Sequence, residues 1–256
     1  MGITPGYLDL VGRIAVVAGG SRGIGAATCR LLAQSGARVA CVARGTAGAE
    51  TLAEGIRDKG GIALAVAADC TRWDEVEHMR RQVETELGSA DLLAAFVGGG
   101  GEPAPVETMS EDAWRSALDT NLTSAFLTLR SFLPGMIARR RGAVVLLASA
   151  AGRQPGGASA AYAAAKAGVV MLTRHVAREV ARHGVRVNCL APSTVLSKAL
   201  RSQLPLESRR QMMAAFPLGR IGEPEDVARA AAFLLSEASS WITGVTIDVA
   251  GGRVMG

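Results

Sequence analysis

The stretch IAVVAGGSRGIG, residues 14–25, decides the fold that we expect of this chain. Its first five residues are apolar and mostly strand-forming, which predicts a buried strand. Gly19, Gly20, Gly23 and Gly25 follow, and then an alanine- and leucine-rich stretch begins. Strand, glycine turn and helix in this order are typical of a loop that cradles a dinucleotide pyrophosphate, because glycine lets the backbone approach the phosphates and the helix N-terminus offers free N–H groups. A plain tight turn, which also uses glycine, is the alternative.

The same alternation of short apolar runs and helical stretches continues along the chain. The runs predict strands at 14–18, 38–43, 62–67, 92–97, 143–148, 186–191 and 246–249. Nearly continuous apolar strands are typical of a sheet that is covered on both faces. We therefore predict a single α/β domain over residues 1–256, a doubly wound seven-stranded parallel sheet with helices on both faces.

The longest irregular stretch spans about residues 192–217 and follows the sixth predicted strand. Open α/β sheets bind ligands at the carboxyl ends of their strands, so we interpret this segment as a substrate cover, either a loop or a helical excursion with the same role. A surface insertion without function is the alternative. Apolar residues in the segment predict an apolar wall for the substrate or a subunit contact: Leu196, Leu200, Leu204 and Met212.

Composition limits the classes of function. The chain has 256 residues and a net charge of +5, and its charges are spread without a basic helix, so we expect no nucleic-acid partner. No apolar run approaches the roughly 20 residues that span a bilayer, and Met1 to Leu10 lacks a signal-peptide pattern, so we expect no membrane partner. The scattered cysteines predict free thiols in a reducing cytoplasm and no metal site: Cys29, Cys41, Cys70 and Cys189.

Two arginines bear on the form of the dinucleotide. The second predicted strand ends in Val42-Ala43-Arg44, without the acid that usually binds a free ribose 2′-OH, and Arg22 lies in the glycine loop. Two guanidiniums could flank a 2′-phosphate, and arginine–phosphate pairing is strong. NADP(H) is therefore favoured over NAD(H), unless Arg44 only begins a solvated loop.

Tyr162 and Lys166 lie four residues apart in the alanine-rich stretch AAYAAAKA, which predicts that they share one helical face. A phenol has a pKa near 10, and a nearby ammonium would lower the Tyr162 pKa. Such a tyrosine can exchange a proton with a carbonyl or alcohol oxygen while hydride moves on carbon. Alone, this spacing would indicate a surface pair; the glycine loop and Ser149 at the end of the fifth strand favour the catalytic interpretation, although Ser149 could also cap a turn.

Together these residues resemble the short-chain dehydrogenase/reductase family over essentially the whole chain. The matching motifs are the glycine loop 19–25, Asp69, Asn121 in DTNL, Ser149, Tyr162-x-x-x-Lys166, VNCLAP at 187–192, PLGR at 217–220, GEPEDVA at 222–228 and VAGG at 249–252. The resemblance implies a Rossmann-type fold. The likeness is best to the 3-oxoacyl-[acyl-carrier-protein] reductase-like members, which implies NADPH as cofactor and a homotetramer.

The resemblance also implies roles for individual residues. Tyr162 would be the acid/base, Ser149 would bind the substrate oxygen, Lys166 would hold the nicotinamide ribose and lower the Tyr162 pKa, and Asn121 would support a water that links Lys166 to solvent. Asp69 would contact the adenine and the Val195 backbone the carboxamide. The implied cofactor-binding residues are Gly19, Ser21, Arg22, Gly23, Ile24, Gly25, Arg44, Asp69, Cys70, Gly98, Tyr162, Lys166 and Val195.

The chain departs from the family pattern in three places. Ala18 replaces the usual threonine, Ala95 stands in AFVG where the family has Asn-Asn-Ala-Gly, and Ser193 replaces a glycine. The first two positions usually tie the central strands through side-chain hydrogen bonds, and their joint loss suggests that apolar packing replaces the tie. Arg140 stands where the carrier-protein reductases have a docking arginine, but His183 replaces a second one.

The leading prediction is an NADPH-dependent reduction of a ketone or 3-oxoacyl carbonyl, thioesters included, to a secondary alcohol. An NAD-dependent secondary-alcohol dehydrogenase is the closest alternative. A non-catalytic dinucleotide-binding sensor or scaffold is an alternative of another class, and the complete set of Asn121, Ser149, Tyr162 and Lys166 argues against it. A sugar-nucleotide epimerase would need a larger C-terminal substrate domain.

Overall fold

Seven parallel strands form one sheet in the computed structural model, which describes residues 10–100, 103–203 and 205–255. The strands are β1 (Ile14–Ala18), β2 (Arg38–Ala43), β3 (Ile62–Ala67), β4 (Leu92–Ala95), β5 (Gly142–Leu147), β6 (Val185–Pro192) and β7 (Thr246–Val249). Their spatial order is β3-β2-β1-β4-β5-β6-β7, and every neighbouring pair is parallel. The order reverses beside β1, which makes the sheet doubly wound, as predicted.

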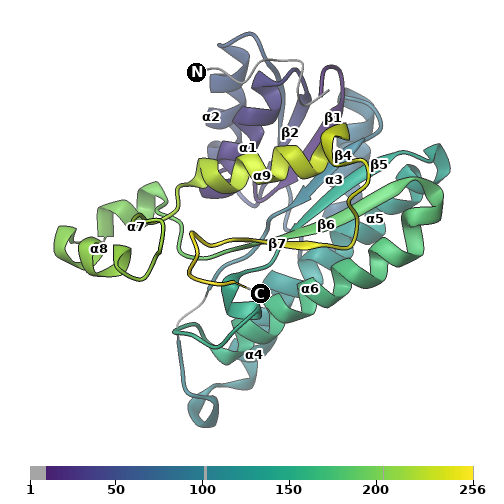
Figure 1. Cartoon of the computed structure of the whole chain (residues 1–256). Coiled ribbons are helices and arrows are strands. Elements are labelled where there is room, and N and C mark those ends of the chain that lie inside the picture. Colours follow the sequence, from purple (N-terminus) through teal and green to yellow (C-terminus); the bar gives the residue numbers. More distant parts are fainter. Residues whose placement is uncertain (1–9, 101–102, 204, 256) are drawn as a thin grey trace.

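Helices cover both faces of this sheet (Figure 1). One layer contains α1 (Gly23–Gln34), α2 (Thr46–Arg57) and α9 (Pro224–Leu235); the other contains α3 (Trp73–Glu86), α5 (Ser124–Arg139) and α6 (Ala160–Val180). The shorter helices are η1 (Val106–Thr108), α4 (Glu111–Leu118), η2 (Asp119–Thr123), η3 (Ala150–Gly152), η4 (Ala181–His183), α7 (Lys198–Gln203), α8 (Leu206–Met213) and η5 (Glu237–Ser239). No helix in the described part of the chain is long and apolar enough to cross a membrane. The expectation for residues 1–9 lies outside the described residues.

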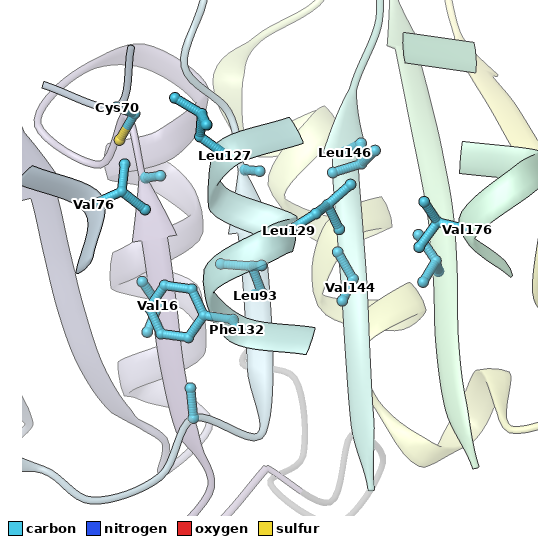
Figure 2. Close-up of a cluster of buried hydrophobic side chains, with 14 of the residues drawn as sticks. Val16, Cys70, Val76, Leu93, Leu127, Leu129, Phe132, Val144, Leu146 and Val176 are labelled. Atoms are coloured by element: carbon cyan, nitrogen blue, oxygen red, sulfur yellow. The ribbon is translucent and has the colours of Figure 1, made fainter. Parts of the chain in front are cut away.

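The core lies on the two faces of the central strands, because successive strand residues point to opposite faces. Figure 2 shows Val16, Leu93 and Val144 of three neighbouring strands packed against Leu129 and Phe132 of α5. Burying one such side chain stabilises the fold by about 1.5–3 kcal/mol. A second cluster packs the other face of these strands against α1 and α9. Both faces of the central strands are therefore packed, which fixes the positions of their carboxyl ends.

The predicted end of the fourth strand differs from the structure in an informative way. β4 ends at Ala95 rather than at residue 97, because its pairing with β1 stops at the partners Ala18 and Ala95. Beyond that point the backbone of Phe96 passes so close to Gly19 that a Cβ on Gly19 would lie 2.9 Å from it. The chain after β4 is therefore packed directly against the glycine loop.

The 192–217 segment is largely helical, which is one of the two forms that we expected for it. β6 extends through Pro192, and the segment then folds into α7 and α8, which lie outside both helical layers (Figure 1). Leu196 is buried with Phe216 and Ile221 in a small separate core, and Leu200 and Met212 pack against it. These side chains thus stabilise the segment itself, whereas Leu204 lies outside the described residues.

The packing of Ala18 against Ala95 yields a prediction. Both side chains are buried, at 0% and 5% exposure. Ala18→Thr should lower the free energy of unfolding by about 1–3 kcal/mol, because the added hydroxyl has no polar partner at residue 95. The double variant Ala18→Thr/Ala95→Asn should recover part of the loss. Urea unfolding of the wild type, Ala18→Thr, Ala95→Asn and the double variant measures the coupling between the two residues. Strictly additive losses of unfolding free energy would contradict it.

Candidate active site

The position of Lys166 follows from how α6 begins. The Ser159 side chain accepts a hydrogen bond from the Tyr162 N–H at 3.3 Å, which caps the helix and sets its first turn. Lys166, one turn after Tyr162, is 2% exposed, and its Nζ donates to the Leu147 carbonyl at the end of β5 at 2.7 Å. Burial lowers the pKa of Lys166 to about 8.

Asn121 lies in η2, a single wide π-turn between α4 and α5. Such turns interrupt a helix and often occur at functional sites. The Asn121 Oδ1 accepts from the Gly99 N–H at 3.1 Å, and its Nδ2 donates to the carbonyls of Gly99 and Ala117, both at 3.0 Å. The side chain therefore binds the loop after β4 to the interrupted helix.

Gly98 lies between Asn121 and Lys166. A Cβ at this position would be 2.7 Å from the Asn121 Oδ1 and 2.9 Å from the Lys166 Nζ, distances that real Cβ contacts do not show. A side chain at residue 98 would therefore have to displace the end of the Asn121 or the Lys166 side chain. The structure brings together three predicted site residues that are far apart in the sequence.

Ser149 and Tyr162 meet at the carboxyl end of β5. A hydrogen bond with the Ser149 side chain lowers the pKa of the Tyr162 phenol, but burial of the ring raises it by more, so the phenol pKa lies above its ordinary value. We expected Lys166 to lower this pKa, and that effect is not found. The Lys166 Nζ lies 5.7 Å from the centroid of the Tyr162 ring and donates to the Leu147 carbonyl instead.

The glycine loop closes tightly at the start of α1. A Cβ on Gly25 would overlap the Gly19 carbonyl oxygen, and Gly19 and Gly23 have φ values of +83° and +52°. Helix α1 has no side-chain cap at its N-terminal residue Arg22 and no acidic residue in its first turn. Its first N–H groups are therefore suited to an anion, and Ser21 and Ile24 lie in the same turn.

Arg22 and Arg44 are exposed at the ends of the glycine loop and of β2. Within the described residues neither guanidinium forms an ion pair or a hydrogen bond, so both are available to a bound anion. The Asp69 carboxylate accepts from the N–H and hydroxyl of Thr71, and these bonds, aided by the charge of Arg44, hold its pKa below the ordinary value. Cys70 beside it is buried, and burial raises its pKa to about 12.

Val195 lies at the start of the 192–217 segment, at the same edge of the sheet as Ser149. It pairs with Gly222 in an isolated parallel bridge, in which the Leu196 N–H donates to the Gly222 carbonyl at 2.7 Å. This bridge ties the beginning of the segment to the loop that precedes α9. The Val195 backbone is thereby held near the carboxyl ends of the strands, as its predicted role needs.

Three residues have structural roles in the site that the sequence interpretation did not assign, although it placed the segment from Gly152 to Ser159 among those that set substrate specificity. Ser159 caps α6, and its position three residues before Tyr162 is a signal that would have indicated it. Gly152 contacts α6 so closely that a Cβ would lie 2.6 Å from the Ala167 nitrogen. Leu147 acts through its carbonyl, which no side-chain pattern can show.

Comparisons with known proteins identify related sequences and structures. Residues 18–253 match the family described as "Enoyl-(Acyl carrier protein) reductase". The chain is 38% identical over 252 residues to the 3-oxoacyl-[acyl-carrier-protein] reductase FabG of Vibrio cholerae, covering 97% of this chain and 100% of that protein. It is 40% identical over 240 residues to the cis-4-hydroxycyclohexanecarboxylate dehydrogenase of Sinomonas cyclohexanicum, covering 94% and 96%. A 3-oxoacyl-[acyl-carrier protein] reductase structure from Brucella melitensis with bound NAD superposes with a TM-score of 0.89 at 31% identity, covering 100% and 98%.

The chain therefore belongs to the short-chain dehydrogenase/reductase family. It is an NAD(P)-dependent oxidoreductase of that family, with the Rossmann-type fold that the sequence predicts.

The close approach at Gly98 yields a prediction for this site. Gly98→Ala should displace Asn121 or Lys166 and lower kcat by about a hundredfold, the effect of an ångström-scale misplacement of catalytic groups. Gly100→Ala, two residues further along, is the matched control, because a Cβ there meets nothing within 4 Å. Steady-state kinetics of the two variants provide the test, and equal kcat values would show that the close approach is unimportant.

Proposed function

We propose that the protein reduces a ketone or 3-oxoacyl carbonyl to a secondary alcohol with NADPH, using Tyr162 as the proton donor. The observation that carries this proposal is the placement of Tyr162 on α6, one helical turn from the buried Lys166, beside the turn that begins at Ser149 after β5. A substrate carbonyl placed at the carboxyl end of β5 could receive hydrogen bonds from both the Tyr162 phenol and the Ser149 hydroxyl.

The residues present fit a dinucleotide. The glycine loop would admit its pyrophosphate, since a Cβ at Gly19 or Gly25 would meet backbone atoms, and the uncapped N-terminus of α1 offers N–H donors. Arg22 and Arg44 would hold the 2′-phosphate, Asp69 the adenine side, Lys166 the nicotinamide ribose and Val195 the carboxamide. When bound, the cofactor supplies the hydride that reaches the carbonyl carbon.

The residues of this chain would orient the substrate oxygen and supply the proton that it receives. Ser149 would orient the substrate oxygen, and Tyr162 would donate its proton as negative charge develops there. Because burial raises the pKa of Tyr162, the phenol stays protonated at neutral pH, which suits an acid in the reductive direction. Lys166 and Asn121 would return a proton to Tyr162 through the ribose and a water.

Two features support NADPH and a thioester among the substrates. Arg22 and Arg44 form no ion pair within the described residues, and the end of β2 carries no acid for a free ribose hydroxyl. Several similar proteins are named 3-oxoacyl-[acyl-carrier-protein] reductases, whereas one similar protein is named a dehydrogenase. Oxidation of a secondary alcohol with NAD remains the competing function, since one similar structure holds NAD.

Assembly into a homotetramer in the cytoplasm belongs to the same proposal. Phe126 of α5 and Met171 of α6 are 46% and 50% exposed, and such apolar side chains on adjacent helices suit a subunit contact. The four cysteines are all buried and unpaired, which suits a reducing compartment.

The proton-donor role predicts the effect of removing one hydroxyl. Tyr162→Phe should lower NADPH oxidation with ketones and 3-oxoacyl thioesters by about 10²–10⁴-fold while the Kd of NADPH stays within about twofold. A panel of these substrates, followed at the absorbance of the reduced nicotinamide, measures the first quantity, and fluorescence titration measures the second. Retained turnover in the variant would refute Tyr162 as the donor.

The phosphate assignment predicts a selective loss of affinity. Arg44→Ala and Arg22→Ala should each raise the Kd of NADPH by about tenfold or more, because each removes a charge-assisted hydrogen bond, while the Kd of NADH should change little. Titration of both cofactors against the same variants gives the comparison. An NADPH affinity unchanged by Arg44→Ala would exclude Arg44 from the 2′-phosphate site.

A further inference from the structure

An ion pair connects the turn after Ser149 to the last strand of the sheet. The Arg153 Nη2 lies 3.3 Å from the Asp248 Oδ2, and the two side chains are 21% and 12% exposed. The second carboxylate oxygen of Asp248 is buried and has no hydrogen-bond partner in the described part of the chain. A carboxylate so far removed from water depends on its cation, which makes this pair hard to separate.

The turn between Ser149 and Arg153 is short and closed by hydrogen bonds. The Ser149 Oγ accepts from the Ala151 N–H at 3.2 Å, and the Ser149 carbonyl accepts from the Gly152 N–H at 2.9 Å. The Ala150 carbonyl accepts from the Arg153 N–H at 3.0 Å. Because these hydrogen bonds connect Arg153 to Ser149 without a flexible segment between them, a displacement of Arg153 would also displace the Ser149 hydroxyl.

The same turn is held from two sides. On one side Gly152 touches the backbone of α6, where a Cβ would lie 2.6 Å from the Lys166 carbonyl carbon. On the other side Arg153 pairs with Asp248 of β7, which is in register with Ala191 of β6. The turn is therefore clamped between the helix that carries Tyr162 and the edge strand of the sheet.

We propose that Arg153 and Asp248 are positioning residues that hold the turn beginning at Ser149 against α6, the helix that carries Tyr162. This inference rests on the proposed function, since it gives the pair a role in proton transfer. The two residues are 95 apart in the chain and neither occurs in a catalytic motif. The last strand thereby acts on the chemistry without touching substrate or cofactor.

The test uses Asp248→Asn, which keeps the size of the side chain and removes its charge. We expect kcat to fall by about tenfold, because the loss of the ion pair should displace Ser149 by less than the replacement of a catalytic group would. The Kd of NADPH should stay within about twofold. Since the Ser149 hydrogen bond lowers the Tyr162 pKa, loosening it should raise that pKa. In the alcohol-oxidising direction, where Tyr162 must be ionised, the pH of half-maximal rate should therefore move upward.

The matched control is Glu237→Gln. Glu237 pairs with Arg13 at 2.7 Å at the opposite end of the strands, and its side chain is 55% exposed. This variant should change neither kcat nor the pH profile. If Asp248→Asn does not fold, Arg153→Lys keeps the positive charge without the planar fork and should show the same changes in smaller size.

The outcomes are separable from those of the proposed function. A wild-type protein that reduces no carbonyl compound and oxidises no alcohol would overturn the proposed function and with it this inference. An active wild type whose kcat and pH profile are unchanged by Asp248→Asn, or changed equally by Glu237→Gln, would overturn the positioning role alone.

Discussion

The burial of one ammonium group determines how the carboxyl edge of the sheet is built. Lys166 is 2% exposed, and removing a charge from water is costly unless neighbouring groups compensate it. The Leu147 carbonyl accepts one of its hydrogen bonds, and the backbone at Gly98 comes so close that a Cβ there would lie 2.9 Å from the Lys166 Nζ. The loop after β4, the π-turn at Asn121, the end of β5 and helix α6 all meet at this ammonium.

The four segments can come together at Lys166 only if the central strands keep fixed positions relative to one another. Alanines at residues 18 and 95 face each other across β1 and β4 in the apolar interior, so at these positions the two strands are joined by the backbone ladder and by packing. The packed strands hold the polar side chains of the candidate site in fixed positions at the carboxyl ends of the sheet. Gly152 packs the turn after Ser149 against α6, and Gly19 packs the glycine loop against the chain after β4 at the same edge.

Much of this architecture was predictable, because it follows from local patterns. The apolar runs predicted all seven strands, and β1, β2, β3 and β7 have the predicted bounds. The helical spacing of Tyr162 and Lys166 placed both on α6, as the structure has them. The motifs identified the family and its chemistry for the same reason, since each lies within a few consecutive residues.

What was not predictable depends on contacts between distant segments. The pairing of Arg153 with Asp248, the seating of Gly98 against Lys166 and the carbonyl of Leu147 leave no local trace in the sequence. The direction of the Tyr162 pKa shift was wrong because spacing shows a neighbouring charge but not the depth of burial, and burial is the larger effect. The bounds of α7 and α8 could not be predicted, because the apolar residues of this segment form a small core of their own.

The central claim, that Lys166 is buried at the meeting point of the site, can be measured directly. The chain has only three lysines, Lys59, Lys166 and Lys198, so selective isotope labelling gives an NMR titration of three ammonium signals. The signal that disappears in Lys166→Arg should titrate with a pKa of about 8, well below the ordinary value of 10.5. A Lys166 signal that titrates near 10.5 would contradict the account.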